Sequence, residues 1–224
     1  MKKLLFLLAA LPLLCNAQSS RFSKMDLESI KLKLGSAAAK VAVSKIQDKD
    51  KTLELLNAQI DTVGNPLIKQ NKDAILELTK GLGFGALYGF THAENTAIPL
   101  VYKYNSGNVL IFDALCSVSV YNKNALSRNE TAKKVVNEIC IPAMCTIDEI
   151  KYQGIEYVGL IVAYTTKDFT AKYASVGLPC CILMVSPVSE LHKLANCQIT
   201  EQELISKSDF YLKDYELRRI EVKP

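Results

Sequence analysis

Apolar residues recur at helical spacing over the first part of the chain, residues 24–82. The first stripe, with steps of three and four residues, consists of Leu27, Ile30, Leu34, Ala37 and Val41. Two shorter stripes follow at residues 53–63 and 67–82. Between them, Asn65 suits a helix N-cap and Pro66 suits the first position of the next helix. The pattern predicts three amphipathic helices in succession.

From residue 97 onward the pattern becomes that of strands. Residues 98–104 and 109–121 are rich in Val, Ile, Tyr and Phe, and the polar stretch between them is typical of a turn, so we expect a β-hairpin. A second hairpin is expected over residues 149–166, turning at Gln153 and Gly154. Two further strands are expected, at residues 178–185 and 210–222.

Helices are expected between these strands. Ser127, followed three residues later by Glu130, has the spacing of a capping box and predicts a helix over residues 125–139 that ends before Pro142. Short helices are expected at residues 188–195 and 201–207. The sum predicts an α+β fold, with an N-terminal helical layer followed by a mostly antiparallel sheet of about five strands and helices on one face. We expect residues 18–224 to form a single globular domain.

The first 17 residues have the pattern of a cleaved secretory signal peptide. A short basic stretch precedes an apolar run at residues 4–14, which is too short for a comfortable transmembrane helix. Cys15 and Ala17 place small residues at the −3 and −1 positions, so cleavage is expected between Ala17 and Gln18. The short Lys-Lys start favours a bacterial envelope, and hence a periplasmic or secreted protein.

An alternative makes Cys15 the acylated residue of a lipoprotein. That site needs a small residue before the cysteine, and Leu14 stands there, so lipid anchoring is disfavoured. Cleavage removes two lysines and lowers the formal charge from +4 to +2. The remaining charges are interspersed, which argues against a nucleic-acid partner. No later apolar run is long enough to span a bilayer, so no transmembrane segment is expected after cleavage.

Seven cysteines become six once Cys15 leaves with the signal peptide. An oxidising compartment favours pairing, and Cys140 and Cys145 are close enough in sequence to form a local disulfide. Cys116, Cys180 and Cys181 lie in apolar strand patterns, where a free cysteine usually serves as a small core residue.

Two motifs resemble cofactor or metal sites, but the residues around each of them do not fit such a site. The sequence Gly81-Leu82-Gly83-Phe84-Gly85-Ala86 fits G-x-G-x-x-A, but a helix instead of a strand precedes it, so we expect a tightly packed crossover and no dinucleotide. His92-Ala93-Glu94 fits the H-x-E of zinc deaminases, but the required P-C-x-x-C does not follow. We therefore expect neither a cofactor nor a metal.

Three functional hypotheses remain open. The leading one is an exported, soluble, non-enzymatic protein that binds a protein, lipid or glycan partner. The alternative is a hydrolase or thiol-dependent enzyme whose site is assembled around His92, with His192 as the other available base. The second alternative is a membrane-active factor that uses the apolar segment from Gly81 to Phe90.

Overall fold

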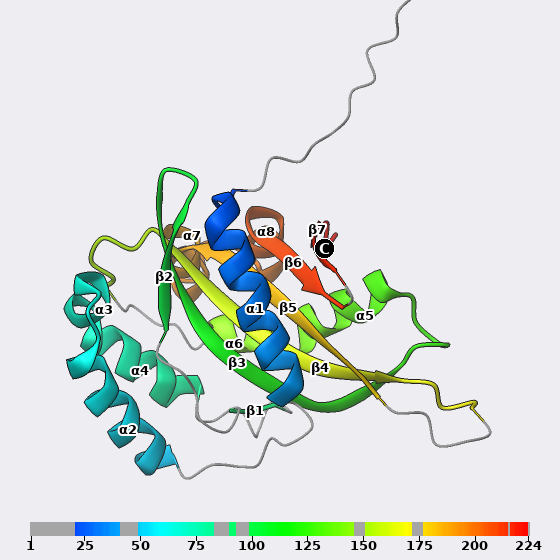
Figure 1. Ribbon diagram of the computed structural model, residues 1–224. Helices are drawn as coiled ribbons and strands as arrows, with labels where there is room; N and C mark the ends of the chain where they lie inside the picture. The colour runs from blue at the N-terminus through cyan, green and yellow to red at the C-terminus, as the bar shows by residue number, and fades with distance from the viewer. Residues whose placement is uncertain are drawn as a thin grey trace, which may run out of the picture.

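A seven-stranded sheet with helices on both faces forms the centre of the molecule (Figure 1). The computed structural model describes residues 21–40, 49–82, 90–92, 99–145, 151–171, 177–214 and 216–223. The fold is therefore α+β, as the sequence pattern predicts. The signal-peptide prediction falls on residues 1–17, which lie outside the described residues.

The sheet is mixed, which corrects the expectation of a mostly antiparallel one. Its strands are β1 (Phe90–His92), β2 (Leu100–Tyr104), β3 (Gly107–Asn122), β4 (Tyr157–Lys167), β5 (Leu178–Pro187), β6 (Asp209–Lys213) and β7 (Leu217–Ile220). Their order is β1-β3-β4-β5-β6-β7, and β2 also pairs with β3. The long, curved β3 and β4 run parallel, whereas every other pair is antiparallel (Figure 1).

The second hairpin expected over residues 149–166 is wrong. In its place β4 pairs in parallel with β3. Residues 151–156 contain no strand, although Gly154 does make a turn, with a φ of +66°. The helical segment after β3 returns the chain to the end where β3 began, so β4 starts at Tyr157 beside Val109. Parallel neighbours require such a crossover, because a tight turn joins only antiparallel strands.

The helices cover both faces of the sheet, which corrects the expectation of one covered face. In chain order they are α1 (Lys24–Lys40), α2 (Lys49–Thr62), α3 (Pro66–Gln70), α4 (Lys72–Leu82), α5 (Arg128–Val135), α6 (Ile141–Cys145), α7 (Val188–Ala195) and α8 (Glu201–Lys207). In Figure 1, α1 crosses the front of the sheet, α5 to α8 lie behind it, and α2 to α4 lie beside β2.

Two apolar cores, one on each face, hold these layers together. In β4, Val158, Leu160 and Val162 point into the core shared with α5 to α8, and the alternate residues Ile161 and Ala163 point into the core under α1. Both side-chain sets are buried because both faces of this central strand are covered. This is why β4 has a continuous apolar run and not an alternating one: each of its faces meets a core.

Two predicted boundaries are wrong for local reasons. The helix that begins after Ser127 continues past residue 139 through a π-helical turn, Val136–Cys140, into α6. Pro142 lies inside this continuous stretch, directly after the π-helical turn, so its missing N–H leaves one backbone bond unmade without ending the helix. The predicted last strand is two strands, β6 and β7, which pair as a hairpin. The short helices α7 and α8 have the predicted bounds.

Candidate functional site

A cavity of about 400 Å³ opens where the start of α5 meets the end of β4 and the start of β5. Its lining comes from segments far apart in sequence and consists of Lys123, Leu126, Ser127, Arg128, Thr131, Tyr164, Thr166, Leu178, Pro179, Cys180, Leu212 and Asp214. A volume of this size is in the range of small-molecule sites.

The inner wall of the cavity is apolar and uncharged. Tyr164 and Cys180 are buried, with 2% and 7% of their surfaces exposed, and Leu212 of β6 packs beside them in the same core. The Tyr164 ring stands edge-on to Tyr121, with centroids 5.7 Å apart. Burial raises the pKa of both the Tyr164 phenol and the Cys180 thiol, so each stays neutral at physiological pH.

One side of the cavity is cationic. Asp214 pairs with Arg128 (Nη1–Oδ2 3.1 Å) and with Arg218 (Nη2–Oδ2 3.5 Å), so two guanidiniums share one carboxylate. Asp214 is only 11% exposed, whereas Arg128 is 62% exposed at the mouth. Lys123 adds a second cation to the lining, 4.0 Å from Asp168. The carboxylate holds Arg128 in place while an excess of positive charge remains.

The first turn of α5 is already occupied by its own side chains. The Ser127 N–H donates to Glu130 Oε2 (2.7 Å), and the Glu130 N–H donates to Ser127 Oγ (3.3 Å). Hydrogen bonds from the Ser127 side chain and from the Ser127 N–H to its carboxylate lower the pKa of Glu130 below its usual value. The predicted capping box is thereby confirmed. An anionic ligand would consequently meet the side chains of Arg128 and Lys123 and not the helix end.

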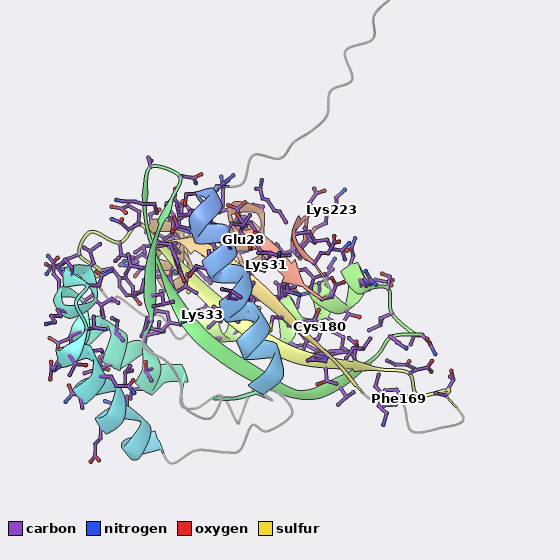
Figure 2. All side chains as sticks on the ribbon, viewed as in Figure 1. Glu28, Lys31, Lys33, Phe169, Cys180 and Lys223 are labelled. Carbon is purple, nitrogen blue, oxygen red and sulfur yellow. The ribbon has the colours of Figure 1, made fainter. Side chains whose placement is uncertain are left out.

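A hydrogen-bonded turn beside the cavity presents an aromatic ring to solvent. Asp168 Oδ1 accepts hydrogen bonds from the Thr170 N–H (2.9 Å) and from Asn124 Nδ2 (2.5 Å), which ties the turn to the segment that carries Lys123. Phe169 between them is 56% exposed, and Leu178 at the cavity rim is 38% exposed. In Figure 2, Phe169 lies in the turn beyond β4 and Cys180 lies on β5.

The histidines do not complete a catalytic pair among the described residues. His92 lies on β1, where its backbone is in register with Leu115, and its side chain is outside the described residues. His192 lies on α7, and its buried Nε2 has no hydrogen-bond partner in the described part of the chain. His192 Nε2 therefore makes no hydrogen bond to a cysteine in that part. Residues 83–89, which carry most of the glycine-rich segment, are likewise not described.

The predicted Cys140–Cys145 disulfide is not present. Both thiols are free, with Cys140 buried and Cys145 exposed. The cysteines belong to one continuous helical stretch instead of a loop, and Cys140 points into the core while Cys145 ends α6. Burial raises the pKa of Cys140 to well above the ordinary range, as expected for a core thiol. Cys180 and Cys181 are buried, as the strand pattern predicts.

The cavity residues were not identified as a site from sequence. Arg128 stands directly after the predicted N-cap, and Asp214 stands between two strands, but nothing in their spacing places them together. The signal that could have drawn attention to this region is the polar stretch from residue 122 to 131 that separates two buried segments.

Within the described residues, no group of three or more His, Cys, Asp or Glu side chains could hold a metal ion. The helices in that part of the chain are all too short or too polar to cross a membrane. In comparisons with known proteins, no family model, curated protein or solved structure matches the chain.

Proposed function

We propose that the chain is an exported, non-enzymatic binding protein and that its ligand is a small amphipathic molecule held in the cavity beside α5. The observation that carries this proposal is the combination of an apolar inner wall around Tyr164 and Cys180 with a cationic side formed by Arg128 and Lys123. An apolar body would displace water from the wall, and an anionic or polar end would face the two cations.

Catalysis is not favoured by the groups that line the cavity. The Cys180 thiol lies 4.0 Å from Thr166 Oγ1 and 3.8 Å from the Leu178 carbonyl oxygen. A thiol nucleophile needs a base within hydrogen-bond reach, and neither group is one. The raised pKa of Cys180 also disfavours the reactive thiolate.

Export is part of the proposal and rests on the sequence. The basic start, the apolar run at residues 4–14 and the small residues before Gln18 are typical of a signal peptide. A lipid-like ligand suits an envelope protein, because such molecules need an apolar carrier in water.

The test fills the cavity mouth and measures binding of an amphipathic probe. 1-Anilinonaphthalene-8-sulfonate has an aromatic body and one anionic group, and its fluorescence rises in apolar surroundings. We expect saturable binding to the mature protein and about tenfold weaker binding to Leu178→Trp, because the indole would occupy the rim. Leu178 is partly exposed, so the larger side chain has room to avoid the core.

Val120→Trp is the matched control. Val120 is 46% exposed and lies opposite Thr165 in the register, so it points to the other face of the sheet from the cavity residue Thr166. This variant should bind the probe like the unaltered protein. Equal binding by both variants, or no saturable binding at all, would refute the proposed site.

A further inference from the structure

A second charged cluster lies at the opposite side of β6, around the buried Asp209. Only 6% of Asp209 is exposed. Its Oδ2 accepts a hydrogen bond from the Tyr104 hydroxyl and pairs with Arg21 Nη1 at 2.7 Å, and its Oδ1 accepts from Arg219 Nη2. The carboxylate therefore has hydrogen-bond donors on both oxygens.

The two arginines keep donors to spare. A guanidinium carries five N–H groups in a planar fork, and each arginine uses one nitrogen on Asp209. Arg21 is 40% exposed and Arg219 is 27% exposed, so both reach solvent. Asp209 thus fixes two guanidiniums side by side without consuming their capacity to bind an anion.

These arginines line a hollow of about 320 Å³ together with two lysines. The side chains of Lys207 at the end of α8 and Lys223 after β7 make no ion pair among the described residues. The charged lining residues are Arg21, Lys207, Arg219 and Lys223 against Asp209 and Glu221. The lining carries more positive than negative charge, and its one buried carboxylate is already neutralised.

We propose that this hollow binds a phosphate group. A phosphate dianion offers several acceptor oxygens, which suit the planar fork of an arginine and the point charges of lysines. The four cations and two carboxylates of the lining leave a formal charge of +2, which a phosphate dianion would balance. The site is separate from the cavity beside α5 and does not depend on the function proposed for that cavity. Lys223 lies by β7 and the C-terminus (Figure 2).

The first arm of the test titrates inorganic phosphate into the mature protein by calorimetry at low ionic strength. We expect saturable binding and a loss of about tenfold in affinity for the double variant Lys207→Gln/Lys223→Gln, since both lysines are exposed and make no ion pair with the described residues. The matched control is Lys31→Gln/Lys69→Gln, which removes the same charge from α1 and α3. It should keep the affinity.

The second arm distinguishes a soluble phosphate from a lipid headgroup. Vesicles of phosphatidylcholine with phosphatidylglycerol are compared with phosphatidylcholine alone. A headgroup is identified as the source if the protein binds the anionic vesicles, if free phosphate competes with that binding, and if Lys207→Gln/Lys223→Gln abolishes it. Phosphate binding without vesicle binding identifies a soluble phosphate ester. An absence of binding in both arms, or equal losses in both double variants, would overturn the phosphate site.

Discussion

Gly159 in the middle of β4 has no room for a side chain. A Cβ built there would lie 2.9 Å from Ile111 Cγ1 and 3.3 Å from Leu183 Cδ1, on the two neighbouring strands. Gly159→Ala should therefore destabilise the protein by about 1–3 kcal/mol, because a well-packed core does not accept an added methyl group without shifts. Chemical denaturation followed by circular dichroism would measure the change.

Gly64 provides the comparison for that substitution. It lies between α2 and α3, and a Cβ there would meet nothing within 4 Å. Gly64→Ala should leave the free energy of unfolding unchanged or raise it slightly, through the lower entropy of the unfolded chain. If the two alanine variants were equally stable, the close packing around Gly159 would be wrong.

At the scale of single residues, the sequence predicts burial better than it predicts sites. Cys180 and Cys181 are core residues because an apolar strand pattern implies two covered faces. Asp209 has no such signal, since its partners Arg21 and Arg219 come from either end of the chain. A buried ion pair formed across the fold depends on tertiary geometry, which linear spacing does not contain.

Among the elements, α5 shows how much local chemistry specifies. Ser127→Ala removes the N-cap and should cost about 1 kcal/mol of stability at neutral pH. The pKa of Glu130 is lowered mainly by its bonds to Ser127, so the carboxylate's contribution is present above its unfolded pKa and is lost as pH falls through the folded pKa. The difference from the unaltered protein should shrink in acid. Thermal unfolding from pH 7 down to pH 3 would test this.

Ser206→Ala is the control for that cap. Ser206 is an exposed serine inside α8, and its hydroxyl donates to the Glu203 carbonyl oxygen at 2.7 Å instead of capping the helix. Its substitution should change stability by less than about 0.5 kcal/mol at any pH. A pH-independent loss in Ser127→Ala would contradict the role assigned to Glu130.

The sequence-based predictions are wrong where the pairing between strands decides the structure. The stripes of α1 to α4 and the β2–β3 turn are visible in sequence because each depends on neighbours a few residues away. The direction of β4 is not visible, because the same apolar run suits a parallel or an antiparallel neighbour. The sequence therefore specifies most helices and strands, and tertiary contacts decide how the strands join.

For the whole molecule, processing at the N-terminus is the most direct prediction. The protein purified from its natural source should begin at Gln18, because the apolar run at residues 4–14 is long enough for a signal peptide and short for an anchor. Intact-mass measurement would reveal this start and any lipid on Cys15. A product that still begins at Met1 and is recovered from the cytosol would remove the argument for export.

The parallel pairing of β3 with β4 also bears on how the chain is made. Residues 123–156 separate the two strands, so the β2–β3 hairpin leaves the ribosome well before β4 has been synthesised. Until β4 arrives, a nascent chain carries a long strand with an open, apolar edge that another copy can pair with. The risk of aggregation is therefore greatest until β4 pairs with β3. Conditions that slow synthesis of the segment between these strands would prolong that interval.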